Sequence, residues 1–162
     1  MASTAAPPRP GQGTSITPDN ASGQGVLMLT TKPGDATHFP KKGDTCRVHY
    51  VGYISSGLKF DSSRDRQQTF TFVLGSGAVV RGIDEAVKLM SRNQVVVLTI
   101  PPLYGYGVNG YPPIIPANET ITVELELISF SEFAKVGMTQ EQIAVKAKDK
   151  KNHDMFQEKT GF

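Results

Sequence analysis

The segment Thr120–Ser129 narrows the range of folds most, because polar and apolar side chains alternate in it from Thr120 to Leu127. Successive side chains of a β-strand point to opposite faces, so this pattern predicts a strand with one buried face and one solvated face. Such strands are typical of antiparallel sheets that are covered on one side only. The apolar positions are Ile121, Val123, Leu125 and Leu127, and the polar positions between them are Thr122, Glu124 and Glu126.

Four further strands and one short helix are predicted upstream. Gln94–Ile100 is rich in the β-branched residues that suit a pleated surface, and it ends at a Pro-Pro pair that cannot donate to a ladder. Arg81–Met90 has apolar residues at positions i, i+3, i+4 and i+7, which is typical of a helix with one buried face. One helix against a twisted antiparallel sheet is an α+β arrangement. The other predicted strands are Gly25–Thr31, Cys46–Ile54 and Thr69–Leu74.

Changes in composition divide the chain into three parts. Residues 1–24 are rich in Pro, Gly and Ser and are predicted to form a disordered arm, because they have too little apolar surface to offset the entropy of ordering. Residues 25–130 hold every strand pattern and form the predicted domain. Residues 131–162 are a charged, Lys-rich extension, in which Thr139 and Gln142 predict a capping box for a helix over Gln140–Lys150.

Composition and charge argue against several functions. The 17 basic and 15 acidic residues leave a net charge of +2, so we expect neither a nucleic-acid partner nor a membrane partner. The chain has no membrane-spanning run and no secretory signal pattern, which predicts a cytoplasmic location, with the nucleus as the alternative. The single cysteine, Cys46, cannot form an internal disulfide. Because His38, His49 and His153 lack the spacing of metal ligands, we expect no metal site and no cofactor.

The aromatic residues gather in loops and at strand ends. Leu103–Pro116 holds three tyrosines among Gly and Pro residues, where burial in a regular core is difficult. Aromatic side chains that loops hold around a sheet favour an apolar binding pocket. The set comprises Tyr50, Tyr53, Phe60, Phe70, Phe72, Tyr104, Tyr106 and Tyr111.

Four segments of the predicted domain match a known pattern in order and spacing. They are VHYVGYISSGLKFDSSRDR (48–66), FTFVLGSGAVVRGIDEAVKLM (70–90), LTIPPLYGYG (98–107) and IIPANETITVELELISF (114–130). Together they resemble the FKBP family, the peptidyl-prolyl cis-trans isomerases that bind the macrolides tacrolimus and rapamycin. The likeness covers about residues 25–130 and neither flank. It implies a five- or six-stranded antiparallel sheet wrapped around one short helix.

The resemblance also implies a shallow pocket between the helix and the sheet. The implied catalytic residues are Tyr50, Phe60, Asp61 and Tyr106. The residues implied to bind substrate or macrolide are Tyr50, Phe60, Asp61, Arg66, Phe70, Val79, Val80, Ile83, Tyr106, Tyr111, Ile114, Ile115 and Val123.

Three of these positions depart from the family pattern. Ile83 stands where most members have a Trp, Val123 where a Phe is usual, and Tyr111 where a His is common. The two aromatic-to-aliphatic changes predict a wider pocket. The main hypothesis is an isomerase that rotates X-Pro peptide bonds, assists protein folding and binds tacrolimus and rapamycin. The alternative is a macrolide- or peptide-binding module with weak or no turnover, because Ile83 and Val123 replace pocket aromatics.

The partners implied by the resemblance are of two kinds. Proline-containing peptides and proteins are the expected substrates, and tacrolimus- and rapamycin-type macrolides are the expected ligands. Through a bound drug, calcineurin or a TOR kinase is a candidate protein partner. The chain itself is expected to be a monomer.

Overall fold

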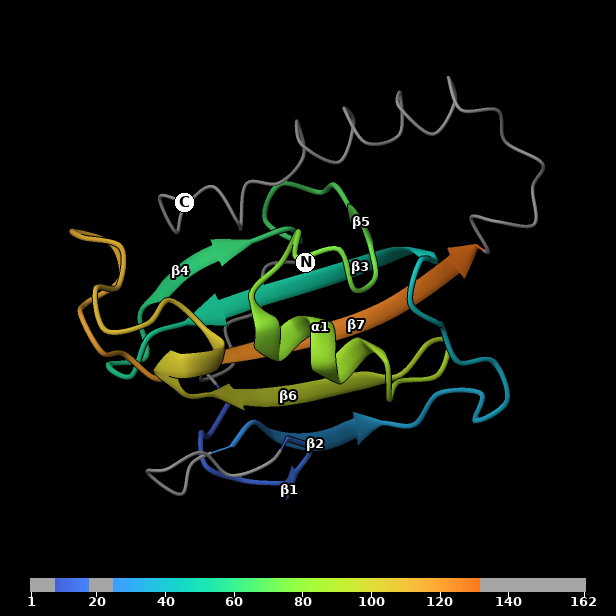
Figure 1. Ribbon diagram of the computed structural model, residues 1–162, viewed down its shortest axis with the longest axis horizontal. Helices are drawn as coiled ribbons and strands as arrows, with labels where there is room; N and C mark the ends of the chain where they lie inside the picture. The colour runs from blue at the N-terminus through green and yellow to red at the C-terminus, as the bar shows by residue number, and fades with distance from the viewer. Residues whose placement is uncertain (1–7, 18–24, 132–162) are drawn as a thin grey trace.

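The computed structural model describes residues 8–17 and 25–131, in which seven strands form one sheet beside a short α-helix (Figure 1). A 3₁₀ turn, η1, spans Pro102–Tyr104. The α-helix, α1, spans Arg81–Val87. The strands are β1 (Thr14–Ser15), β2 (Leu27–Lys32), β3 (Thr45–Tyr53), β4 (Lys59–Ser62), β5 (Phe70–Val73), β6 (Val95–Ile100) and β7 (Ile121–Ser131).

Every strand pair in the sheet is antiparallel, and the strand order is β1-β2-β6-β7-β3-β4. The long strand β3 pairs with β7 along one edge over its whole length. Its other edge is shared, because β5 pairs with Thr45–Val48 and β4 pairs with Val51–Tyr53. The chain that joins β4 to β5 therefore leaves the sheet and returns to it on the same edge of β3.

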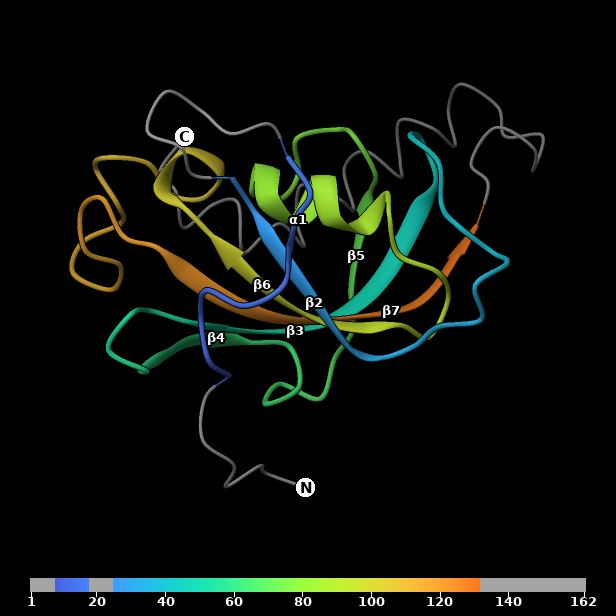
Figure 2. The same cartoon turned by 90° about the horizontal axis from the view of Figure 1, so that it is seen from below.

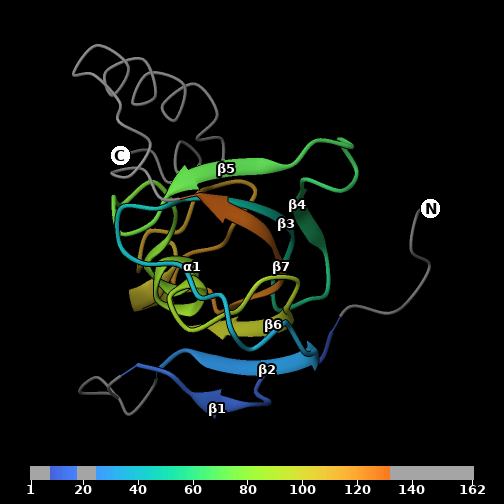
Figure 3. The same cartoon turned by 90° about the vertical axis from the view of Figure 1, so that its right-hand side faces the viewer.

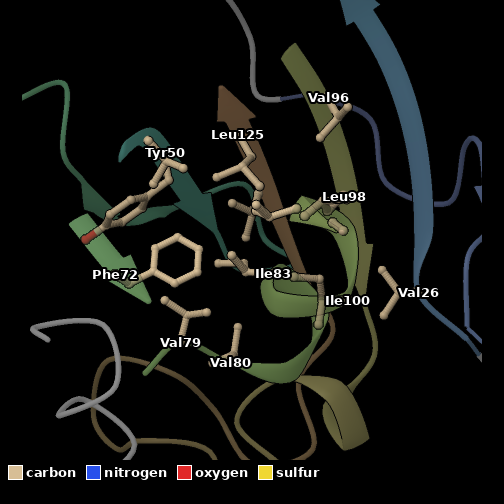
Figure 4. Close-up of a cluster of buried hydrophobic side chains, with 14 of the residues drawn as sticks. Val26, Tyr50, Phe72, Val79, Val80, Ile83, Val96, Leu98, Ile100 and Leu125 are labelled. Atoms are coloured by element: carbon tan, nitrogen blue, oxygen red, sulfur yellow. The ribbon is translucent and has the colours of Figure 1, made fainter. Parts of the chain in front are cut away.

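Helix α1 covers the concave face of the twisted sheet (Figure 2). Its buried residues are Gly82 together with Ile83, Ala86 and Val87, of which the last three are those that the helical periodicity predicts. They pack into one core with the inward-facing residues of the central strands, among them Leu98, Ile100 and Leu125 (Figure 4). The buried face predicted for the last strand is confirmed, since Ile121, Val123, Leu125 and Leu127 are all fully buried. The opposite face is solvated only in part, because Thr122 is 4% exposed whereas Glu124 and Glu126 are half-buried.

The α+β prediction is confirmed, with differences in detail. The sheet has seven strands where five or six were expected, because β1 and β4 have no periodic pattern that would reveal them. The helix ends at Val87 rather than at Met90, because the Leu89 and Met90 N–H groups donate to Ala86 and Val87 in tight turns. The predicted C-terminal helix lies outside the described residues. Within the described ranges, no helix is long and apolar enough to cross a membrane.

The prediction that residues 1–24 form a disordered arm is wrong for residues 8–17, which we call the N-terminal strap. Strand β1 of this strap pairs with β2, and the Ile16 N–H donates to the Val26 carbonyl at 2.9 Å (Figure 3). The prediction counted only the side chains of the segment. It omitted the hydrogen-bonding groups that the edge of β2 offers to any chain that can lie beside it.

Candidate active site

The hairpin of β3 and β4 brings Tyr50, Asp61 and Arg66 into one hydrogen-bonded group. The Tyr50 hydroxyl donates to Asp61 Oδ2 at 2.9 Å, and Arg66 Nη1 donates to Asp61 Oδ1 at 2.5 Å. Arg66 Nη2 donates to the Tyr50 oxygen at 2.8 Å, and its guanidinium carbon lies 5.7 Å from the centre of the tyrosine ring. The register of the hairpin sets this contact, because Asp61 is paired with Gly52, two residues after Tyr50.

Burial makes this group electrostatically unusual. Tyr50 is 1% exposed and Asp61 is 7% exposed, whereas the Arg66 side chain is 39% exposed. Burial, followed by the negative charge of Asp61, raises the pKa of the Tyr50 phenol well above its ordinary value. Burial opposes the charge of Arg66, but its hydrogen bonds to Asp61 and Tyr50 outweigh this effect and raise the pKa of the guanidinium. The phenol therefore stays a hydrogen-bond donor to Asp61 at neutral pH.

Ser63 holds the backbone of Tyr50 in place, although the sequence analysis did not single it out. Its Oγ accepts a hydrogen bond from the Tyr50 N–H at 2.8 Å, and its own N–H donates to the Tyr50 carbonyl at 3.0 Å. His49 Nδ1 lies 2.9 Å from the same Oγ. Ser63 is fully buried, so this support is protected from water. The only signal in the sequence was its place inside the DSSRDR motif.

Edge-to-face ring contacts join the predicted site aromatics in pairs. Tyr50 and Phe70 have ring centres 5.8 Å apart at 87°, and Phe60 and Tyr106 have ring centres 6.1 Å apart at 88°. Phe72, which was not predicted to belong to the site, stacks on Phe70 at 6.0 Å. In Figure 4, Phe72 lies beside Ile83, with Val79 next to it.

Gly52 is a further residue that the sequence analysis missed. A Cβ atom built at this position would lie 2.6 Å from Cζ of Phe60, which is closer than any real contact of this kind. Phe60 can therefore fold its ring across β3 only because residue 52 has no side chain. A glycine within an alternating strand was the available signal, since such a residue often marks a close approach.

The loop before α1 brings Val79 and Val80 to the same cluster as Ile83 (Figure 4). The Val80 carbonyl accepts hydrogen bonds from the Ile83 and Asp84 N–H groups at 3.0 and 3.2 Å. The Asp84 carboxylate in turn accepts a hydrogen bond from the Gly75 N–H at 2.9 Å, which fixes the start of the loop. Among the described residues, no group accepts a hydrogen bond from the Val80 N–H.

The long loop between β6 and β7 supplies Tyr106, Tyr111, Ile114 and Ile115, whereas Val123 lies on β7 and is fully buried. Tyr111 and Ile115 form an isolated bridge in which each N–H donates to the other residue's carbonyl, at 2.8 and 2.9 Å. Ile115 is fully buried and Tyr106 nearly so, while Tyr111 is partly buried against the core. Ile114 differs from these residues because it is 41% exposed.

Most of the predicted site residues thus lie in the core cluster of the domain or pack against it. Phe60 and Tyr111 pack against the common core cluster, and Asp61 and Arg66 join it through Tyr50. Ile114 stands apart on the loop surface. The chemical role of each residue stays a prediction. The predicted site residues that lie within the core cluster are Tyr50, Phe70, Val79, Val80, Ile83, Tyr106, Ile115 and Val123.

Comparison with known proteins identifies the family. The model of the FKBP-type peptidyl-prolyl cis-trans isomerase family matches residues 36–128. FK506-binding protein 1A of Aspergillus fumigatus is 47% identical over 107 residues, which is 66% of this chain and 96% of that relative. Peptidyl-prolyl cis-trans isomerase FKBP1A of Xenopus laevis is 49% identical over 104 residues, covering 64% of this chain and 96% of that relative. The chain belongs to the family of FKBP-type peptidyl-prolyl cis-trans isomerases, and it is an enzyme that rotates the peptide bond before proline.

Proposed function

We propose that the residues gathered beside α1 are the site at which this isomerase holds and twists an X-Pro bond. The observation that carries the proposal is the meeting of the Tyr50–Phe70 and Phe60–Tyr106 ring pairs with one shared apolar cluster. Phe60 is the partly exposed member of these pairs, so it would form the entrance side. Tyr50, Phe70 and Ile83 would form the floor.

An apolar site of this kind can catalyse the reaction without moving a proton. The barrier of about 18–20 kcal/mol arises because twisting the amide breaks the double-bond character of its C–N bond. The twisted amide has less charge separation on its carbonyl oxygen than the planar amide. It therefore loses less when water is removed, so an apolar wall stabilises it relative to the ground state.

Three polar groups would then orient the peptide. The Val80 N–H is available to a substrate carbonyl, and the Tyr106 hydroxyl would act at the mouth of the site. Asp61, held by Tyr50 and Arg66, would present its charge to the twisting carbonyl rather than act as a base. In this reading Arg66 is a positioning residue, because it acts through Asp61.

An active isomerase is favoured over a binding module without turnover, because the matched family is defined by isomerase activity. The aliphatic residues Ile83 and Val123 would then alter the rate and the fit of ligands, and not the presence of catalysis.

A protease-coupled isomerisation assay on a Leu-Pro or Phe-Pro peptide tests the site. We expect Phe60→Ala to lower kcat/KM by about tenfold or more, since each 1.36 kcal/mol of lost transition-state stabilisation costs tenfold. Asp61→Ala should also reduce turnover. Leu58→Ala is the matched control, because Leu58 lies in the same hairpin and is 63% exposed. Normal turnover by folded Phe60→Ala protein would refute the assignment.

Macrolide binding is the second part of the proposal. The Aspergillus fumigatus relative is named as an FK506-binding protein, and FK506 is tacrolimus. We infer that this chain binds tacrolimus and rapamycin at the same cluster. Ile83→Trp should tighten tacrolimus binding in calorimetry by refilling the floor, and an unchanged or weaker affinity would count against Ile83 as part of that floor.

We also infer that the protein is a cytoplasmic monomer. A cytoplasmic monomer would meet proline-containing client proteins directly. With a macrolide bound, it would present the drug and the exposed Ile114 loop to calcineurin or a TOR kinase. Pull-down of either protein in the presence of drug, and not in its absence, would support this inference.

A further inference from the structure

A side chain ties the turn of the β3–β4 hairpin to the long loop between β6 and β7. Glu119 Oε2 accepts a hydrogen bond from the Ser55 N–H at 2.6 Å, although the two residues are 64 positions apart in the sequence. The last backbone pair between β3 and β7 joins Tyr53 to Thr122. The bond therefore lies just beyond this ladder, at the end of the sheet where the hairpin turn and the loop are found (Figure 1).

The hairpin turn closes with its own backbone groups and does not use the Ser55 N–H. The Gly57 N–H donates to the Ile54 carbonyl at 2.9 Å, and the Ile54 N–H donates to the Leu58 carbonyl at 3.0 Å. Neither Ser55 nor Ser56 has a positive φ, whereas Gly57 has a φ of 93°. These features are typical of a three-residue hairpin loop, in which a type I turn is followed by a left-handed residue. Ser55 is the second residue of this turn.

The loop on the other side of the bond is closed upon itself. Tyr111 and Ile115 exchange backbone hydrogen bonds. A Cβ atom at Gly110 would overlap the Pro116 carbonyl oxygen, so the two limbs of the loop touch at this point. Asn118 then turns the chain with a φ of 55°, which asparagine tolerates. Because the limbs are joined, a restraint on the residue after this turn restrains the whole loop.

The hairpin and the loop also meet inside the candidate site. Phe60 lies on β4, shortly after the hairpin turn, and Tyr106 lies in the loop. Their ring centres are 6.1 Å apart at 88°. The position of one ring relative to the other thus depends on how the hairpin sits against the loop.

We propose that Glu119 is a positioning residue, which holds the hairpin against the loop and so sets the spacing of Phe60 and Tyr106 before a peptide binds. The inference rests on the proposed function, because it requires that the peptide contacts both rings. A site whose walls are already in place loses less freedom on binding, which favours affinity. Removal of the Glu119 carboxylate should therefore raise KM and leave kcat unchanged.

The expected change in KM is moderate. A carboxylate acceptor strengthens a hydrogen bond, but this contact is exposed, so water competes for both groups. The net contribution of an ordinary hydrogen bond corresponds to a change in affinity of about three- to tenfold.

Steady-state kinetics on a Leu-Pro peptide test the proposal. Glu119→Ala should raise KM about three- to tenfold with kcat unchanged. Glu119→Gln keeps an oxygen that can accept the bond, so its KM should stay within about twofold of that of the unchanged protein. Glu124→Ala is the matched control, because it removes the same charge from a half-buried position on β7, and it should leave KM unchanged.

Ser55→Pro removes the donor of the same hydrogen bond. Proline is favoured at the second position of a type I turn, so the hairpin should keep its turn. Ser55→Pro should raise KM as much as Glu119→Ala does, and the double variant should have no higher KM than either single variant, because both substitutions remove one bond. Additive changes would overturn the proposal. Hydrogen exchange of the Ser55 amide, followed by NMR, should be faster in Glu119→Ala than in Glu119→Gln.

The remaining outcomes separate the role of Glu119 from the proposed function. An unchanged KM in Glu119→Ala would overturn this role, as would a KM in Glu119→Gln as high as that in Glu119→Ala. If Phe60→Ala is impaired in the same assay, the proposed site then stands without Glu119. Normal turnover by folded Phe60→Ala protein would refute the proposed site and the role of Glu119 together. Urea unfolding of each variant reports that it is folded.

Discussion

Tyr50→Phe removes one oxygen atom, and with it the hydroxyl that joins Asp61 to Arg66. The phenyl ring and its edge contact with Phe70 remain, so little packing changes. A hydrogen bond to a charged partner contributes about 1.5–3 kcal/mol, and Asp61 is nearly buried. The ion pair between Arg66 and Asp61 contributes about 1 kcal/mol or less to stability, because the Arg66 side chain is 39% exposed. We expect Tyr50→Phe to lower the free energy of unfolding by about 2 kcal/mol.

A double-mutant cycle with Asp61→Asn isolates the interaction. Urea unfolding of the two single variants and the double variant should give a coupling free energy of about 1–2 kcal/mol. Measuring the isomerase turnover of the same proteins separates an effect on stability from an effect on catalysis. If Asp61 acts on the substrate, Asp61→Asn loses more activity than Tyr50→Phe does at equal loss of stability. A coupling below about 0.5 kcal/mol would refute the view that Tyr50 holds Asp61 in place.

The raised pKa of Tyr50 gives the same variant a signature at high pH. Above about pH 10 the phenol ionises in the unfolded chain but stays protonated in the folded protein. The folded state then binds the extra proton, so stability is complete below the unfolded pKa and falls as the pH rises toward the folded pKa. The free energy of unfolding of Tyr50→Phe should fall less steeply over this pH range than that of the unchanged protein. Equal pH dependence in the two proteins would show that burial of the phenol has no such effect.

Three other changes test neighbouring parts of the structure. Gly52→Ala should displace Phe60, lower turnover and cost about 1–3 kcal/mol of stability, and unchanged turnover would contradict the close approach. Burial, aided by nearby carboxylates, raises the pKa of Cys46 to about 12, so its thiol should resist disulfide reagents at neutral pH until the protein unfolds. Reaction at the rate of a free thiol would contradict this. Asp84→Ala should speed hydrogen exchange of the Gly75 amide and lower turnover, whereas a Gly75 amide that exchanges as before would show that Asp84 does not anchor the loop.

Sequence periodicity predicted the elements whose faces differ in burial. Strand β7 alternates because one face lies on the core, and α1 has a buried stripe for the same reason. Strand β4 has only four residues, and its burial pattern does not alternate. It forms because the end of β3 extends beyond its pairing with β5 and leaves an edge to occupy. Periodicity within one segment cannot reveal a strand that forms only because a neighbouring strand offers it an edge.

The residue types of the candidate site could be predicted from the sequence, but the residues that hold them in place could not. Aromatic residues among turn formers indicated a pocket, and the resemblance placed Asp61 and Arg66 beside Tyr50. Ser63 and Gly52 were missed because they act through the backbone and through the absence of a side chain. Their contributions depend on the register of β3 against β4, which residue types do not encode.

The N-terminal strap shows a limit of composition as a guide to order. Ordering the backbone costs about 1–2 kcal/mol per residue, and the strap has too few apolar side chains to offset this cost through burial. What the composition omits is that β2 already presents its N–H and C=O groups along a fixed line. Because β2 is already ordered, a segment that pairs with it must order only its own backbone. Each added residue therefore gains its hydrogen bonds at the entropy cost of ordering one residue and not two. A polar, glycine-rich segment can therefore be ordered wherever it follows or precedes an unpaired edge, and Gly13→Val measures this directly, because it blocks the approach to the edge while leaving the composition of the segment almost unchanged.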